Sequence, residues 1–152
     1  MATEIEKAQI ELAIFANFIR FSGLPIPVST AEKRNPPEPD ILCSLGTEGK
    51  VAFELVEICD PNIARALADP KPNLDGVEYI STSDPSLQIV GNKLRKVYQT
   101  SHPVELLCYT NGRVITPSDV IVPTILPLLD CYRHTFRKAW LLSEGEVFKV
   151  WG

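Results

Sequence analysis

The chain has 152 residues, of which 45% are apolar and 22% are charged, as in an ordinary globular protein. A chain of this length predicts one domain, residues 1–152, with a core that needs no disulfide or metal support. The formal net charge of −4 argues against a large basic surface for tight, nonspecific nucleic-acid binding, and leaves room only for local basic patches.

The first predicted element is a helix that begins after Thr3. Thr3 and Glu6 have the spacing of a capping box, apolar residues then recur at helical intervals, and Gly23 suits a helix C-cap. The proline-rich stretch LPIPVSTAEKRNPPEP follows, and it predicts an extended loop with a short edge strand at residues 26–29.

Two strand-like segments come next. PDILCSL (39–45) and KVAFELVEI (50–58) flank the turn sequence GTEG, which predicts a β-hairpin. The second segment is apolar on both faces, so we place it near the centre of a sheet covered by helices. At most one short helix is expected in CDPNIARALADPKPNLDG (59–76).

A second long helical pattern begins at Asp84, which suits an N-cap followed by proline at the first helical position. Its apolar stripe consists of Leu87, Val90, Leu94 and Val97. PVELLCYT (103–110) then predicts another buried strand.

The last third of the chain predicts a helix and a closing hairpin. The helix begins near Thr116, and Pro123 is expected to interrupt it, so that the main helix restarts at Thr124. AWLLS (139–143) and VFKVW (147–151) flank EGE and form the hairpin. The order helix, hairpin, helix, strand, helix, hairpin predicts an α/β or α+β fold, a mixed β-sheet flanked by helices.

No membrane segment or secretory signal is evident. Charged residues interrupt the first apolar pattern and no apolar run reaches about 18 residues, so we expect a soluble, cytoplasmic protein without a membrane partner. The four cysteines are widely separated and form no CxxC pair. They predict reduced, mostly buried thiols and give no support for a zinc site.

Carboxylates on the predicted hairpin are the most informative feature of the sequence. Asp40 opens the first strand and Glu54 lies in the middle of the second, where burial of an unpaired charge is costly. Paired residue numbers should sum to about 95, and sums of 94 or 96 bring Asp40 and Glu54 together, whereas 95 turns them to opposite faces. Together they suit a hard cation such as Mg²⁺; alternatively, Glu54 pairs with Lys93, Arg95 or Lys96.

The PD of Pro39 and Asp40, followed after thirteen residues by ELV from Glu54, resembles the PD-(D/E)xK nuclease superfamily, which includes restriction endonucleases and Holliday-junction resolvases. The order of elements over residues 37–112 is similar as well. The resemblance implies a restriction-endonuclease-like domain in which Asp40 and Glu54 bind Mg²⁺ or Mn²⁺. Glu57 is a further candidate ligand, although alternation points its side chain to the other face.

Val56 departs from the superfamily pattern, because the motif lysine belongs two residues after the acid. That lysine helps to position the attacking water and stabilises charge on the phosphate, which valine cannot do. Some superfamily members supply the lysine from the following helix, and here Lys93 and Lys96 are the candidates.

Two functions from different classes follow from these residues. The first is a Mg²⁺-dependent nuclease that hydrolyses phosphodiester bonds of DNA, with Asp40, Glu54, Lys93 and Lys96 in the catalytic site. The second is a catalytically inactive relative that keeps the fold and acts as an interaction or dimerisation module, for instance as a homodimer. A nucleotide-binding domain is disfavoured because no glycine-rich loop joins a strand to a helix.

Overall fold

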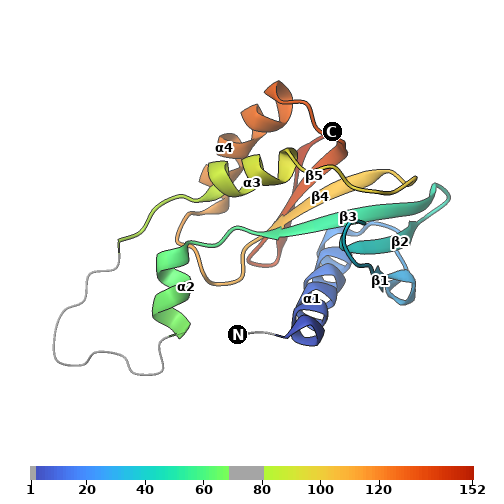
Figure 1. Cartoon of the computed structure of the whole chain (residues 1–152), viewed down its shortest axis with the longest axis horizontal. Helices are drawn as coiled ribbons and strands as arrows, with labels where there is room; N and C mark the ends of the chain where they lie inside the picture. Colours follow the sequence, from blue (N-terminus) through green and yellow to red (C-terminus); the bar gives the residue numbers. More distant parts are fainter. Residues whose placement is uncertain (1–2, 69–80) are drawn as a thin grey trace.

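The structure is a computed structural model that describes residues 3–68 and 81–152 (Figure 1). In chain order its elements are α1 (Glu4–Ser22), a 3₁₀ turn (Val28–Thr30), β1 (Glu32–Lys33), β2 (Ile41–Leu45), β3 (Gly49–Glu57), α2 (Pro61–Ala68), α3 (Ser86–Leu94), β4 (Val104–Tyr109), α4 (Ser118–Cys131), β5 (Phe136–Ser143) and β6 (Glu146–Trp151).

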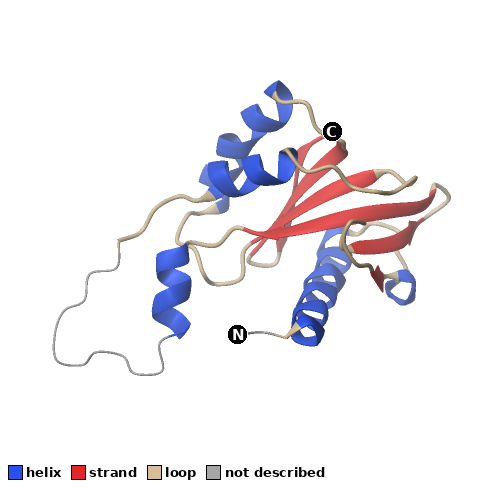
Figure 2. Cartoon of the chain, viewed as in Figure 1, coloured by secondary structure: helices blue, strands red, loops and turns tan. Residues whose placement is uncertain are grey.

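The strands of the described residues form one six-stranded sheet in the order β1-β2-β3-β4-β5-β6. The pairs β3–β4 and β4–β5 are parallel, and the other neighbouring pairs are antiparallel. Helices α3 and α4 lie on one face of the sheet and α1 lies on the other (Figure 2). The predicted α/β class with a mixed sheet is therefore confirmed.

Two apolar clusters, one on each face of the sheet, make the core. Val90 of α3 and Ile121 and Ile125 of α4 belong to the first cluster, and Phe15 and Phe18 of α1 belong to the second. Every residue of β4 is buried, as expected for a central strand with helices on both sides. The central strands therefore fix the positions of both helix layers.

The start of the chain follows the predicted signals. Thr3 and Glu6 form the capping box of α1, and Gly23 closes the helix in the left-handed conformation, with a φ of 71°. The edge strand is displaced, however: residues 28–30 form a 3₁₀ turn, and Glu32 and Lys33 make the short strand instead. Since Pro27 has no N–H to donate, residues 26–29 are poorly suited to pair with a neighbouring strand.

Helix α3 is shorter than its apolar stripe suggested. It ends at Leu94, and although Val90 and Leu94 are buried, Leu87 and Val97 are 53% and 82% exposed. The N-cap of α3 is Pro85 rather than the predicted Asp84, although Asp84 Oδ1 accepts a hydrogen bond from the Ser86 backbone N–H at 3.0 Å.

The interruption predicted at Pro123 was wrong. Helix α4 runs without a break from Ser118 to Cys131 and contains both Pro123 and Pro127. Each proline removes one helical hydrogen bond, but Ile121, Ile125 and Leu129 lie on one side and pack fully into the core. Burial of that apolar face outweighs the local cost of the prolines.

The cysteines are all free, and they divide between core and surface. Cys43 and Cys108 are buried as predicted, whereas Cys59 is half-buried and Cys131 is exposed. Burial raises the pKa of the Cys43 and Cys108 thiols to about 12, so both stay protonated at neutral pH. Among residues 3–68 and 81–152, no helix has both the length and the apolar character needed to cross a bilayer.

Glu105 is a buried acid in β4 that the sequence pattern did not single out. Its side chain is 1% exposed and accepts hydrogen bonds from Arg137 Nε at 2.8 Å and from Trp140 Nε1 at 2.7 Å. Arg137 also pairs with Glu48 at 2.9 Å. The guanidinium group of Arg137 therefore neutralises a carboxylate in the second apolar cluster.

We expect Arg137→Ala to lower the free energy of unfolding by about 3 kcal/mol, because it leaves the Glu105 charge buried without a partner. Adding Glu105→Gln should recover most of this loss, since the neutral amide still accepts from Trp140. Urea unfolding at neutral pH measures both variants. A double variant no more stable than Arg137→Ala would contradict the assigned pairing.

Candidate functional site

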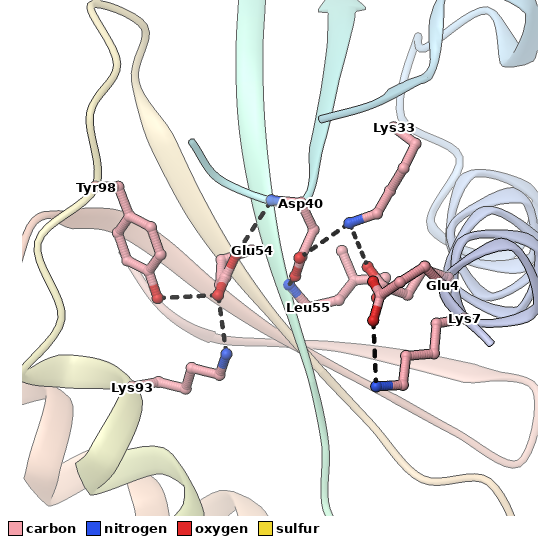
Figure 3. A network of polar contacts seen from close by, with 9 residues as sticks. Glu4, Lys7, Lys33, Asp40, Glu54, Leu55, Lys93 and Tyr98 are labelled. Atoms are coloured by element: carbon pink, nitrogen blue, oxygen red, sulfur yellow. Dashed lines mark hydrogen bonds and ion pairs between the residues drawn. The ribbon is translucent and has the colours of Figure 1, made fainter. Parts of the chain in front are cut away.

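The register of β2 against β3 brings Asp40 and Glu54 together. Ile41 pairs with Phe53, and the next position along the two strands sets Asp40 directly across from Glu54. The numbers of paired residues therefore sum to 94, one of the two registers that bring the acids together. The Asp40 backbone N–H donates to Glu54 Oε1 at 3.1 Å (Figure 3). The two acids are therefore neighbours, one immediately before β2 and the other in the middle of β3.

Glu54 is almost completely buried and has two further donors. The residue is only 5% exposed. Its Oε2 accepts hydrogen bonds from Lys93 Nζ at 2.9 Å and from the Tyr98 hydroxyl at 3.0 Å (Figure 3). Burial, and then the charge of Asp40, raise the pKa of Glu54 above 4.5, although Lys93 opposes the shift. The same surroundings, burial first and the Glu54 charge second, raise the pKa of Tyr98.

Asp40 is held by a backbone amide and by a second lysine. Its Oδ2 accepts from the Leu55 N–H at 2.8 Å, and its Oδ1 accepts from Lys33 Nζ at 3.2 Å. Lys33 also reaches Glu11 of α1 at 3.1 Å. The network therefore runs from α1 through β1 and β2 to β3 and α3.

Glu11 is the site residue that sequence reasoning missed. It lies among charged residues of α1 and looks like any solvent-facing acid, and only the fold brings it to Lys33 and Asp40. Burial, followed by the Asp40 charge, raises the pKa of Glu11. Although burial lowers the pKa of Lys33, the charges of Asp40 and Glu11 outweigh that effect and raise it overall.

A pocket of about 220 Å³ opens beside the two acids. Asp40 and Glu54 line it together with Lys96 and Tyr98, so both candidate lysines lie at the site, Lys93 on Glu54 and Lys96 on the pocket wall. We call this the Asp40–Glu54 pocket. Glu38, which pairs with Arg34 at 3.1 Å, lies at its edge.

Glu57 lies away from this pocket. Its carboxylate pairs with the guanidinium group of Arg113, and its Oε2 accepts from Arg113 Nε at 2.8 Å. Alternation along β3 accounts for the separation, because residues three apart point to opposite faces. Val56, at the position of the superfamily lysine, packs against the first apolar cluster.

The pocket offers two adjacent carboxylates, the kind of donor that a hard divalent cation takes. Mg²⁺ is commonly held by one or two carboxylates, with water and phosphate oxygens completing the shell, and Asp40 and Glu54 supply two adjacent carboxylates. Three carboxylates share two ammonium groups in this network, which leaves one negative charge in excess. The raised pKa of Glu54 and Glu11 follows in part from the same crowding of negative charge.

The protein's own donors already occupy the carboxylates of this network. Each carboxylate oxygen of Asp40 and Glu54 already accepts a hydrogen bond. In the described part of the chain, no group of three acidic, histidine or cysteine side chains forms an arrangement suited to a metal ion. A cation at Asp40 and Glu54 would therefore replace Lys33 and Lys93 as their partner.

No protein-family model, curated protein or solved structure matches the chain.

We expect Lys93→Met to lower the free energy of unfolding by about 2 kcal/mol at pH 8, because it removes the cation from the buried Glu54 carboxylate. The loss should shrink as pH falls, since the folded-state pKa of Glu54 is raised. Glu54 takes up its proton in the folded chain at a higher pH than in the unfolded chain, and a protonated Glu54 no longer needs the ammonium group.

Urea unfolding between pH 4.5 and pH 8 tests this linkage, with 4.5 the ordinary Glu value. Lys96→Met is the matched control, because Lys96 lines the same pocket but forms no ion pair with any residue of 3–68 or 81–152. A loss for Lys93→Met that is the same at every pH, or that Lys96→Met reproduces, would exclude Glu54 as the partner that matters.

Proposed function

We propose that this protein is a divalent-metal-dependent nuclease that hydrolyses phosphodiester bonds of DNA at the Asp40–Glu54 pocket. The observation that carries the proposal is the meeting of three groups from separate elements: Asp40 before β2, Glu54 in β3, and Lys93 of α3, whose Nζ is 2.9 Å from Glu54. The sequence resemblance to PD-(D/E)xK nucleases implies the same two acids.

Asp40 and Glu54 would hold Mg²⁺ or Mn²⁺, and the cation would supply an activated water and neutralise charge on the phosphate. The protein's own groups then have separate tasks. The Leu55 N–H fixes one oxygen of Asp40, and the Asp40 N–H fixes one oxygen of Glu54, so both carboxylates are oriented by the backbone. Such fixed orientation limits the reorganisation needed during reaction.

Lys93 takes the place of the missing motif lysine in this proposal. Val56 carries no donor, whereas the Lys93 ammonium group lies at Glu54 and, once a cation takes its place on that carboxylate, would be available to stabilise negative charge that develops on a phosphate. Lys96 lines the same pocket, and it is suited to attract the DNA backbone rather than to act at the reacting atoms. The proposal therefore assigns different roles to the two lysines.

The alternative is a catalytically inactive protein with the same fold, acting as an interaction or dimerisation module. The observation that favours it is the full occupation of the carboxylate oxygens by protein donors, which makes the network stable without a cation. The apolar face of α4, which could have served as an interface, is instead used against the sheet.

A cleavage assay on supercoiled plasmid and on short single- and double-stranded DNA with Mg²⁺ or Mn²⁺ tests the proposal. We expect Asp40→Asn and Glu54→Gln each to lower the rate by about 100-fold or more, and chelation to abolish it. Glu57→Gln is the matched control and should keep activity, because Glu57 is paired with Arg113 away from the pocket. Activity that survives Glu54→Gln would assign cleavage to another site or to a contaminant.

Metal binding can be measured without cleavage. Mn²⁺ should raise the melting temperature of the wild-type chain by a few degrees, and it should have no such effect on Asp40→Asn. Equal responses of the two proteins, together with no DNA cleavage, would support the inactive module instead.

A further inference from the structure

A second hollow lies outside the candidate catalytic site, between α3 and α4. These helices lie side by side on one face of the sheet (Figure 1). The hollow has a volume of about 350 Å³, and its apolar wall is formed by Leu87, Leu94 and Leu128. We call it the α3–α4 groove. Its size falls within the range of small-ligand sites.

The groove is cationic although the chain as a whole is acidic. Arg95 and Arg133 line it, no aspartate or glutamate does, and neither arginine forms an ion pair within residues 3–68 and 81–152. Exposed arginines beside an apolar wall are a favourable setting for a ligand that carries a negative group, since the guanidinium plane matches phosphate oxygens.

The remaining lining residues suit a flat, partly polar body. Tyr132 is 62% exposed at the end of α4, and Gln88 offers both a donor and an acceptor on its amide. Gly91 has no side chain, and a Cβ there would meet no atom within 4 Å, so the groove is open along α3. An exposed aromatic ring, an amide and arginine are the groups on which unpaired nucleobases stack and form hydrogen bonds.

The end of α3 connects the groove to the candidate catalytic site. Lys93 contacts Glu54, Arg95 lines the groove, and Lys96 lines the Asp40–Glu54 pocket. Three cationic residues within four positions therefore lie on Glu54, on the groove and on the pocket wall, respectively. A nucleic-acid backbone that crosses this turn would meet cationic groups on both sides.

We propose that the α3–α4 groove binds an unpaired nucleotide of the DNA strand, with its base against Tyr132 and the leucines and its phosphate against Arg95 and Arg133. The inference rests on the proposed nuclease function and adds a substrate class to it: DNA with a single-stranded segment next to the cleaved bond. Bases of an intact duplex are stacked inside the helix and cannot enter such a groove.

Fluorescence anisotropy with a labelled thymidine 12-mer, in chelator and at low salt, tests binding apart from cleavage. The single strand should bind at least about tenfold more tightly than a blunt duplex of equal length, and Tyr132→Ala should weaken it by about tenfold. Tyr132→Phe keeps the ring and should bind as the wild type does. Arg95→Gln and Arg133→Gln should each weaken binding and reduce the salt slope by about 0.7.

Arg65→Gln is the matched control for charge, because Arg65 is an exposed cation on α2 outside the groove, and it should bind as the wild type does. Gly91→Leu fills the groove and should weaken binding without lowering the melting temperature. The inference is overturned if Tyr132→Ala binds normally, if Arg65→Gln has the same effect as Arg95→Gln, or if the duplex binds equally well. The inference would also be overturned if thymidine monophosphate displaced the 12-mer and bound as tightly as the 12-mer does, because the groove would then be a site for a free nucleotide.

Failure of this inference differs from failure of the proposed function. Cleavage that requires Asp40, with binding unaffected by Tyr132→Ala, overturns only the groove assignment. Single-strand binding that requires Tyr132, with no metal-dependent cleavage, supports the groove assignment as a binding site while rejecting the nuclease proposal.

Discussion

The pairing of β2 with β3 is the constraint on which the candidate site depends. Ile41 opposite Phe53 sets Asp40 opposite Glu54, and a slip of one residue would turn one of the two acids to the other face of the sheet. The slip is opposed by packing on both sides, because Ile41 and Phe53 belong to one apolar cluster while Leu42 and Ala52 belong to the other. The position of the acids is therefore secured by apolar burial rather than by the acids themselves.

Three acids in and beside the sheet each pair with a cationic side chain and with a second donor. Glu54 has Lys93 and Tyr98, Asp40 has Lys33 and a backbone amide, and Glu105, on the neighbouring strand, has Arg137 and Trp140. Of these three, Glu54 and Asp40 line the Asp40–Glu54 pocket, whose wall also carries Lys96, whereas Glu105 is 1% exposed. This difference separates a structural ion pair from a site that a phosphate could reach, and it is why Asp40 and Glu54 carry the functional proposal and Glu105 does not.

Much of the fold could be predicted from local signals. The capping box at Thr3, the turn GTEG and the uniformly apolar run in β4 each indicate an element from neighbouring residues alone. The predictions that were wrong concern competition between local and tertiary effects. Pro123 is a helix breaker by its own chemistry, and it is tolerated because the core-facing side of α4 is buried.

The site was predictable only in part, for a similar reason. Asp40 and Glu54 were visible as acids on strand-like segments, but the turn left their register open among three values. Glu11 gave no signal, because only the packing of α1 against the sheet brings it to Lys33. Glu105 carried the same signal as Glu54, an acid within an apolar strand, and the difference between them lies in which helix face and which partner each one meets.

The two partners Glu54 and Lys93 belong to elements that differ greatly in how much apolar surface they bury. Glu54 belongs to a central strand, whereas Lys93 belongs to a helix of nine residues that buries only Ser86, Val90 and Leu94. Detaching such a helix exposes far less apolar surface than opening the sheet, so amide protons of α3 should exchange with solvent sooner than those of β3 and β4. Lys93 is therefore carried by the less extensively packed element and Glu54 by the more extensively packed one. The charge balance of the pocket thus depends on how one short helix packs against the sheet.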